Sequence, residues 1–489
     1  MKGLKNNCRP LMFVGTGSDV GKSIIVAGIG RILKQDGFNP APFKAQNMAL
    51  NSFVTKDGLE IGRAQAMQAE SCKVEPEVQM NPILLKPNKD TESQIVLNGK
   101  PIGNFSAKDY FGNDLKNNFF QEVKNSYYYL QNKYFPILIE GAGSISEMNL
   151  WEKDIVNMPV ARFTNAAVFL IADIDKGGVI GNIYGHYKLL KEEDRKLIKG
   201  FIINKFRGDI SLFEDGKKII EQLTGVPVVG VIPYFRDIYL DEEDSLNCKK
   251  RYSDKSKVFK VAVVLLKHMS NFTDFAPFER IDDVNLFYAE NPEELDDADL
   301  IIVPGSKNTI SDMLYLKRKG FDRAIKKHVN SGKGVIGICG GFQILGRKIF
   351  DPYGVESDVQ EIDGIGIFPI VTRMTKDKKT VQRSFRYKNY PEKCIGYEIH
   401  MGETTFFENS PLNFFEDGSA EGFLLNEKCF GTYIHGIFDN SIVLRDIIRK
   451  EITLEDFAAF KDRQYDKLAD ILRSSLNINY IYDCMSGKC

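Results

Sequence analysis

Short runs of consecutive apolar residues recur through the first 235 residues, and amphipathic stretches with helical spacing separate them. The runs are "LMFVG", "PAPFKA", "PILIEGAG", "AVFLIADID", "GFIINKF" and "VPVVGVIP". Most are continuous rather than alternating, which predicts strands buried on both faces, as in a parallel sheet covered by helices. A second series follows, with "FKVAVVLL", "DLIIVPGS", "GVIGICGG" and "KCFGTYIHGIF". The pattern predicts an α/β fold with two doubly wound, mainly parallel sheets.

The chain has 489 residues, too many for one ordinary core. We therefore predict a first domain at residues 1–235 and a second at 259–450. Residues 236–258 are polar and charged, which is typical of a linker. Residues 451–489 read as a helical extension, and its apolar spacing predicts packing on the second domain.

Composition narrows the class of protein. Hydrophobic residues make up 43% and charged residues 27%, with a formal net charge of −1, so neither nucleic acid nor another polyanion is an expected partner. No apolar run approaches the roughly 20 residues that span a membrane, and the start of the chain reads as strand and loop rather than signal peptide. The eight cysteines lack metal-like spacing and fit reduced thiols in a cytoplasm; we interpret the final "CMSGKC" as a frayed tail.

A glycine-rich segment, "GTGSDVGKS" at Gly15–Ser23, lies between the first strand and an amphipathic helix, as a phosphate-binding loop requires. Backbone N–H groups and the helix N-terminus attract phosphates, Lys22 adds a full charge, and the Ser23 hydroxyl can ligate Mg²⁺. The usual spacing would put a glycine at position 16; here the leading glycine is Gly15. We predict that ATP is bound by Thr16, Gly17, Val20, Gly21, Lys22 and Ser23.

Two polar residues end other apolar strands. Glu140 closes "FPILIE", and an acid at the carboxyl end of a parallel strand is well placed to hold Mg²⁺ together with Ser23. Asn204 ends "FIIN" and is a candidate for reading the adenine edge, with capping of a turn as the alternative.

The block "APFKAQNMALNSFVTKDGLEIGRAQAMQAE" at residues 41–70 is unusually rich in amide and basic side chains. This density suits a large polar ligand with many carboxylates and carboxamides, although a solvated helix face is the alternative for any single residue. The candidate substrate contacts are Lys44, Gln46, Asn47 and Asn51. Lys44 follows a strand and is placed to reach a phosphoryl group during transfer.

The segment "GVIGICGGFQILG" reads as strand, tight turn and helix, with Cys339 on the turn. G-x-C-x-G is the thiol counterpart of a nucleophile elbow, and a helix N-terminus favours thiolate. The alternative is a small buried residue at a strand end. Backbone N–H groups here and in "PGSKNT" suggest an oxyanion hole, so Gly305, Gly340 and Gln343 are the candidate oxyanion and glutamine contacts.

A thiolate nucleophile needs a base, and His435 in "GTYIHGIFDN" is the strongest candidate among five histidines because it ends an apolar strand of the same domain. His400 in "GYEIHMGET" is second, and we expect it to contact substrate or close a loop.

The elbow, the "PGSKNT" turn and the strand-end histidine resemble a class I glutamine amidotransferase domain. The longer phosphate loop resembles that of dethiobiotin synthetase and its relatives. Together they are similar to the glutamine-dependent corrinoid amidases, and the motifs, which span residues 12 to about 445, look like the branch that produces cobyric acid. They include "FKAQNMALNS", "EIGRAQAMQAE", "ADIDKGGV", "SNFTDF" and "GTYIHGIFDN".

The resemblance implies ATP- and glutamine-dependent amidation of the b, d, e and g carboxylates of adenosylcobyrinic acid a,c-diamide, with Mg²⁺. It implies a carboxylate activated as acyl phosphate, ammonia released through a Cys339 thioester, and two domains packed face to face. The partners that it implies for the protein are small molecules (corrinoid, glutamine and ATP), and the oligomeric state is left open.

One departure concerns the histidine. Amidotransferase domains of this class commonly carry H-x-E, but Ile437 stands two residues after His435, so the group that orients the imidazole is unassigned. Two other functions are alternatives: the corrinoid amidase that acts earlier, on the a and c positions, and a non-catalytic ATP switch of the partition type. "FKAQNMALNS" argues against the first, and the cysteine elbow against the second.

Overall fold

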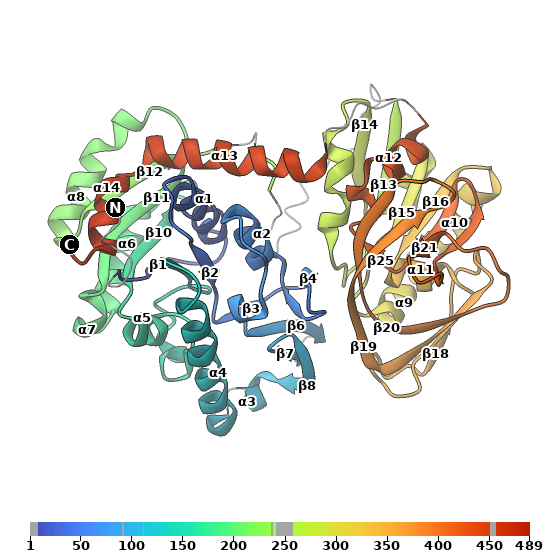
Figure 1. Cartoon of the computed structure of the whole chain (residues 1–489), viewed down its shortest axis with the longest axis horizontal. Helices are drawn as coiled ribbons and strands as arrows, with labels where there is room; N and C mark the ends of the chain where they lie inside the picture. Colours follow the sequence, from blue (N-terminus) through green and yellow to red (C-terminus); the bar gives the residue numbers. More distant parts are fainter. Residues whose placement is uncertain (1–7, 90–91, 111, 236–237, 241–257, 450–455) are drawn as a thin grey trace.

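The computed structural model of the chain describes residues 8–89, 92–110, 112–235, 238–240, 258–449 and 456–489. They form two lobes, with helix α13 (Phe457–Ser475) running across the top from one to the other (Figure 1). The predicted linker, 236–258, lies outside the described residues apart from 238–240 and 258. Among the residues described, no helix is both long and apolar enough to cross a membrane.

The first lobe is built on a six-stranded sheet in the order β12-β11-β10-β1-β9-β2, in which every pair is parallel. Its strands are β1 (Leu11–Gly15), β2 (Ala41–Phe43), β9 (Ile137–Glu140), β10 (Ala167–Asp173), β11 (Ile198–Phe206) and β12 (Val228–Pro233). The helices around it are α1 (Lys22–Gln35), α2 (Arg63–Ser71), α4 (Asn113–Gln131), α5 (Met158–Thr164), α6 (Val179–Leu189) and α8 (Glu214–Thr224).

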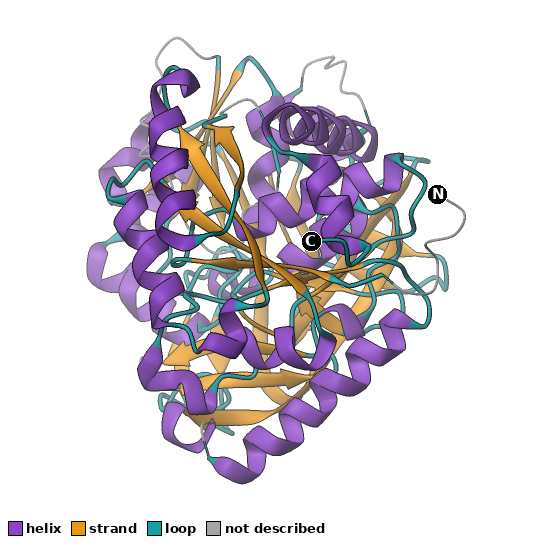
Figure 2. Ribbon diagram, turned by 90° about the vertical axis from the view of Figure 1, so that its left-hand side faces the viewer, coloured by secondary structure: helices purple, strands orange, loops and turns teal. Residues whose placement is uncertain are grey.

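Alternate residues of these strands enter two different cores. In β1, Met12 and Val14 pack in the core beneath α4, α5 and α6, whereas Leu11 and Phe13 pack in the core beneath α1. Both faces are thus covered, which confirms why the strands read as continuous apolar runs. In Figure 2 the helices lie outside and the strands between them.

The second lobe holds another six-stranded sheet, ordered β14-β13-β15-β16-β24-β23 and parallel except for its β23–β24 edge. Its strands are β13 (Phe259–Val264), β14 (Val284–Ala289), β15 (Leu300–Val303), β16 (Gly334–Ile338), β23 (Phe423–Asn426) and β24 (Cys429–Thr432). Its helices are α9 (Thr309–Lys319), α10 (Phe321–Asn330), α11 (Gly340–Leu345) and α12 (Ser441–Ile448). The predicted α/β fold with two mainly parallel sheets is confirmed.

Antiparallel structure was not predicted. Strands β19 (Ile370–Tyr387) and β20 (Lys393–Phe406) form a long antiparallel hairpin in a seven-stranded sheet of the second lobe. In the first lobe, β6 (Ile83–Lys89), β7 (Glu92–Leu97) and β8 (Lys100–Ser106) pair antiparallel, and β3 (Gln46–Met48) joins their sheet parallel to β6. The smaller pair β4 (Ser52–Val54) and β5 (Glu60–Gly62) contacts the hairpin across the two lobes.

The single apolar run "KCFGTYIHGIF" divides between two sheets. Strand β24 belongs to the parallel sheet, whereas β25 (Ile434–His435) pairs with β20 in the antiparallel one. His435 therefore lies where the chain passes from one sheet to the other.

The prediction that the C-terminal helix packs on the second domain is wrong. Leu468 and Leu472 of α13 belong to the core beneath α1 in the first lobe, and a methyl group at Gly28 of α1 would lie 2.3 Å from Leu472. Arg31 of α1, almost fully buried, pairs with Asp462 of α13. The apolar face of α13 could be predicted from the sequence, but the surface on which it packs, the core beneath α1, could not.

The interpretation of "CMSGKC" as a frayed tail is also wrong. Helix α14 (Ile478–Met485) packs in the core beneath α1, where Cys484 is fully buried. Cys484 forms a disulfide with Cys489, so these two cysteines are not reduced thiols here.

Candidate active site

The phosphate loop connects β1 to α1, as predicted. Gly21 has φ +97°, a conformation that favours glycine, and any side chain there would meet the Asn204 amide at 2.2 Å. Asn204 donates from Nδ2 to the Val20 carbonyl oxygen at 2.8 Å. Asn204 therefore supports the loop directly, while its contact with adenine stays a prediction. The Thr16 N–H donates to Ile171 of β10 at 3.0 Å, which ties the loop to the sheet.

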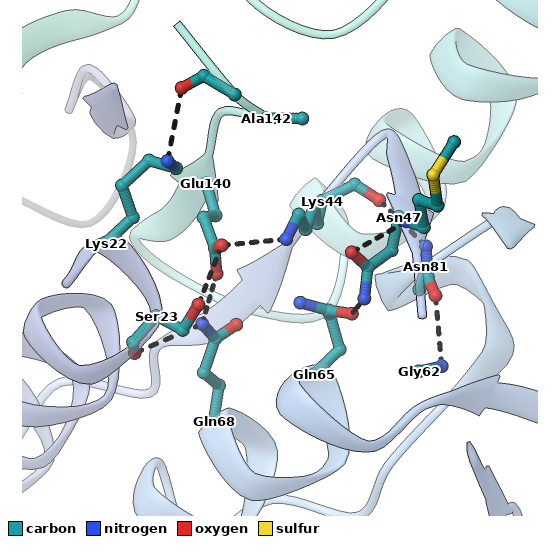
Figure 3. A network of polar contacts seen from close by, with 12 residues as sticks. Lys22, Ser23, Lys44, Asn47, Gly62, Gln65, Gln68, Asn81, Glu140 and Ala142 are labelled. Carbon is teal, nitrogen blue, oxygen red and sulfur yellow. Dashed lines mark hydrogen bonds and ion pairs between the residues drawn. The ribbon is translucent and has the colours of Figure 1, made fainter. Parts of the chain in front are cut away.

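Lys22, Ser23 and Glu140 meet below this loop. Lys22 Nζ donates to the carbonyl oxygens of Gly17 (2.8 Å) and Gly143 (3.2 Å). Ser23 Oγ donates to Glu140 Oε1 at 2.9 Å, and Glu140 is fully buried at the end of β9. Figure 3 shows this network, which extends through Lys44 and Gln68.

Lys44 and Gln68 hold the Glu140 carboxylate from the other side. Lys44 Nζ lies 2.9 Å from Glu140 Oε1, and Gln68 donates from Nε2 to Glu140 Oε2 at 2.5 Å. The buried Oε1 of Gln68 has no hydrogen-bond partner among the described residues. A carboxylate, a hydroxyl and an unsatisfied amide oxygen in one buried place are the oxygen donors that Mg²⁺ prefers, so the residues fit this cation. The described residues contain no cluster of three or more histidine, cysteine or acidic side chains that could hold a metal ion.

A cavity of about 620 Å³, the phosphate-loop cavity, opens beside these residues. Its lining includes Lys22, Lys44, Gln46, Asn47 and Trp151. Three of the four predicted substrate contacts therefore line the same cavity as Lys22.

The fourth predicted contact, Asn51, does not line that cavity. It is 1% exposed and lies at the boundary between the lobes, where its Oδ1 accepts from the Phe272 N–H at 3.3 Å.

The cysteine elbow has the predicted form. Cys339 lies between β16 and α11 with φ +50°, an uncommon conformation for a residue other than glycine. Glycines let the turn pack tightly: a methyl group at Gly341 would lie 1.9 Å from the Val303 carbonyl oxygen, and one at Gly340 2.7 Å from the Ser306 nitrogen. Cys339 is a free thiol, 8% exposed.

His435 lines the same cavity as Cys339, and a carboxylate from a distant part of the chain holds it in place. Its Nδ1 lies 2.6 Å from Asp274 Oδ2, and the Gly436 N–H donates to Asp274 Oδ1 at 2.9 Å. The Tyr397 ring stacks on the imidazole with centroids 5.4 Å apart. Burial alone would lower the pKa of His435, but the Asp274 carboxylate and the contact with Cys339 raise that pKa to about 10.

Asp274 thus occupies the orienting position that Ile437 leaves vacant in the sequence. Ile437 is fully buried in the apolar core, whereas Asp274 lies 161 residues before His435, on the 3₁₀ turn Phe272–Arg280. The motif "SNFTDF" was the available signal, but nothing in its spacing relates it to the histidine.

The predicted oxyanion and glutamine residues lie beside this pair. A methyl group at Gly305 would lie 3.2 Å from His435 Cε1, and Gly340 faces the Ser306 backbone. Gln343 lines the cavity, but its amide donates to Tyr433 Oη (3.2 Å) and accepts from Thr309 Oγ1 (3.3 Å).

The cavity around Cys339, the cysteine cavity, measures about 40 Å³ and is lined from both lobes. Lys86 reaches it from β6 of the first lobe, and Lys307 and Lys378 from the second. Lys86 donates to Glu60 at 2.7 Å, Lys378 pairs with the same carboxylate, and Lys307 donates to Gln94 of β7 at 3.0 Å.

These charged side chains shift one another's pKa values. Burial, with Lys378 and Lys86 nearby, lowers the pKa of Lys307 to about 7. Burial likewise lowers the pKa of Lys378 to about 8. Burial alone would raise the pKa of Glu60, but the two lysines hold it well below its usual range.

Each of the two lobes matches a known protein family. Residues 11–246 match the model of the CobQ/CobB/MinD/ParA nucleotide binding domain, and residues 260–443 match that of the CobB/CobQ-like glutamine amidotransferase domain. A nucleotide-binding domain fused to a glutaminase domain defines a glutamine-dependent ligase.

Curated relatives specify the family. Cobyric acid synthase of Phocaeicola vulgatus is 50% identical over 99% of this chain and 100% of its own length. That of Bacteroides fragilis is 50% identical over 99% of this chain and 100% of its own, and that of Clostridium novyi 45% identical over 98% of each. The chain belongs to the cobyric acid synthase family.

Proposed function

We propose that the chain amidates the b, d, e and g carboxylates of adenosylcobyrinic acid a,c-diamide, using ATP and glutamine, and yields adenosylcobyric acid in cobalamin biosynthesis. The observation that carries this proposal is the pairing, in one chain of the family, of a phosphate loop beside a large polar cavity with a Cys339–His435–Asp274 site. We place the reaction in the cytoplasm, which supplies ATP and glutamine.

In the first half-reaction, a corrinoid carboxylate oxygen attacks the γ-phosphorus of ATP. The bond from that phosphorus to the ADP oxygen breaks, and an acyl phosphate forms. Lys22 and Lys44 place positive charge beside the transferred group, since both line the phosphate-loop cavity. Ser23 and Glu140 would hold Mg²⁺, which supplies charge neutralisation to the phosphates when bound.

In the second half-reaction, the Cys339 thiolate attacks the side-chain amide carbon of glutamine. His435 gives its proton to the leaving nitrogen, the C–N bond breaks, and ammonia and a thioester result. Asp274 keeps the imidazole in the required orientation and stabilises its charged form. Water then hydrolyses the thioester to glutamate, and ammonia displaces phosphate from the acyl phosphate.

Ammonia must pass from the cysteine cavity to the phosphate-loop cavity. A volume of about 40 Å³ suits a water-sized molecule rather than glutamine, so side chains must move for glutamine to enter. Because Lys86 of the first lobe forms part of its wall, ammonia released there already borders the synthetase lobe.

The replacement Cys339→Ser tests the proposal. We expect glutamine-dependent amidation to be lost while amidation driven by added ammonium survives, because only the first needs the nucleophile. If glutamine-dependent product persists in Cys339→Ser, the nucleophile is misassigned. If the parent forms no amide from either nitrogen source with ATP, the ligase function itself is wrong, and an ATP switch becomes the better explanation.

A further inference from the structure

The turn at Asn51 and Ser52 belongs to the synthetase lobe, yet it bonds to the loop that carries Asp274. Asn51 Oδ1 accepts from the Phe272 N–H at 3.3 Å. In the opposite direction, the Ser52 N–H donates to Asn271 Oδ1 at 2.9 Å. Asn51 is 1% and Asn271 3% exposed, so these bonds are shielded from water.

The same turn also holds Tyr397 of the glutaminase lobe. The Tyr397 hydroxyl donates to the Ser52 carbonyl oxygen at 3.1 Å, while its ring stacks on His435. Asp274 is fixed to Asn271 by a backbone bond of 3.0 Å and contacts His435 at 2.6 Å. Two of the groups that contact the imidazole are therefore anchored to one turn of the other lobe.

On its other side, this turn continues into the polar block of the synthetase lobe. Strand β3 contributes Gln46 and Asn47 to the phosphate-loop cavity, and two residues separate its end from the turn. The Asn51 carbonyl oxygen accepts from the Arg63 N–H at 3.2 Å, at the start of α2, and Asn47 bonds to Gln65 of that helix at 3.1 Å. The turn thus lies between the wall of one cavity and the histidine of the other.

We propose that Asn51 is a positioning residue of the glutaminase site, which holds the Asp274 loop so that His435 is aligned with Cys339 only when the two lobes are joined. This inference rests on the proposed function, and it reassigns a residue that the sequence placed among substrate contacts. It makes glutamine hydrolysis depend on a contact supplied by the lobe that consumes the ammonia.

Three variants test the proposal in the full-length enzyme. Asn51→Ala removes the acceptor, Asn51→Asp retains an acceptor oxygen at the same place, and Asn125→Ala on the exposed face of α4 is a matched control. Each is assayed with adenosylcobyrinic acid a,c-diamide and Mg²⁺·ATP, using either glutamine or ammonium chloride. Product and glutamate are quantified, and glutamate release is followed over a range of pH.

For Asn51→Ala we expect glutamine-dependent amidation to fall about five- to tenfold, as for loss of one buried hydrogen bond that aligns a catalytic group. Ammonium-dependent amidation stays within about twofold of the parent, which also shows that the variant is folded and that the ligase function stands. Asn51→Asp recovers most of the glutamine-dependent rate, and the control changes neither.

The pH profile separates positioning from general damage. His435 faces Asp274 and Cys339, with the Tyr397 ring stacked on it, so a looser Asp274 loop moves the alkaline limb of glutamate release to lower pH in Asn51→Ala. A parallel fall of glutamine- and ammonium-dependent rates would make Asn51 a corrinoid contact and overturn the proposal. Unchanged rates with both nitrogen sources would overturn it as well.

Discussion

His435 is fully enclosed between Asp274, Cys339 and the Tyr397 ring, and its proton affinity follows from that position. A pKa of about 10 means that the imidazole is charged at neutral pH, as a thiolate–imidazolium pair requires. Charge on His435 therefore depends chiefly on the Asp274 carboxylate.

Replacing Asp274 by Asn should leave the shape of the site intact but remove this charge. We expect glutamate release to fall by about 10⁴-fold, as when the acid of a Ser-His-Asp triad is neutralised. The alkaline limb of the pH profile should move to lower pH, because His435 loses its proton earlier. Steady-state glutaminase assays check both effects. Ammonium-dependent amidation is the internal control, and a profile identical to that of the parent would refute the role of Asp274.

The same ion pair makes stability depend on pH. The pKa of His435 is raised above its ordinary 6.5, so its contribution to the free energy of unfolding is fully present below about 6.5 and is lost as pH rises through about 10. The difference in unfolding free energy between the parent and Asp274→Asn should therefore shrink steadily over that interval. Urea unfolding at a series of pH values measures it, and a difference that grows with pH contradicts the assignment.

At this scale the sequence identified residues that lie within recognisable local patterns. Cys339, Lys22 and Ser23 sit in loops whose strand–turn–helix context is local, and the structure places them as expected. Asp274 could not be predicted because its partner lies 161 residues away. The position of Asn51 outside the phosphate-loop cavity could not be predicted either, because composition alone does not say which residues of the polar block face that cavity.

At the scale of elements, close packing of α11 against β15 fixes the elbow. The carbonyl oxygen of Val303 occupies the place where a side chain of residue 341 would begin. Cys339 thus precedes a helix that can approach the sheet this closely because residue 341 is glycine.

We expect Gly341→Ala to lower the free energy of unfolding by about 1–3 kcal/mol through overpacking, and to reduce glutaminase activity more strongly than ammonium-dependent amidation. Gly181→Ala, in α6 with no atom within 4 Å of the added methyl group, is the matched control and should be neutral or stabilising by up to about 1 kcal/mol. Chemical denaturation compares the two. Equal stability of both variants would show that the elbow tolerates a side chain.

Elements buried on both faces were predictable because their sequences are continuously apolar. The β19–β20 hairpin was not, since "IVTRMTKDKKTVQRSFRY" carries many charged residues and much of β19 is exposed. Its pairing also shifts register between Met374 and Lys379, which interrupts the alternation that would reveal a strand. This hairpin carries Lys378 and Tyr397 to the boundary between the lobes.

At the scale of the whole molecule, the C-terminal helices return the chain to the first lobe. Helix α13 covers α1, the helix that begins at the phosphate loop, and Figure 1 shows it bridging the top of both lobes. The C-terminal extension therefore completes the core of the synthetase lobe, although in the sequence it comes after the glutaminase lobe.

Leu472→Ala should accordingly destabilise the synthetase lobe by about 2–5 kcal/mol, the range for removing a buried leucine side chain. Ser474→Ala, exposed on the same helix, should change stability by no more than about 0.5 kcal/mol. Thermal unfolding with and without Mg²⁺·ATP reports the effect, because ligand stabilises the lobe that binds it. If Leu472→Ala unfolds at the parent temperature, α13 does not complete this core.

The proposed function requires that one chain make ammonia at Cys339 and consume it at the phosphate loop. Adenosylcobyrinic acid a,c-diamide is incubated with Mg²⁺·ATP, glutamine carrying heavy nitrogen in its side-chain amide, and excess unlabelled ammonium, and mass spectrometry of the product tests this directly. We predict stepwise conversion of acid to amide at four positions, with heavy nitrogen in the product of the parent and only unlabelled amide from Cys339→Ser. A product that carries the same label in both enzymes, or no amide in either, would contradict the account.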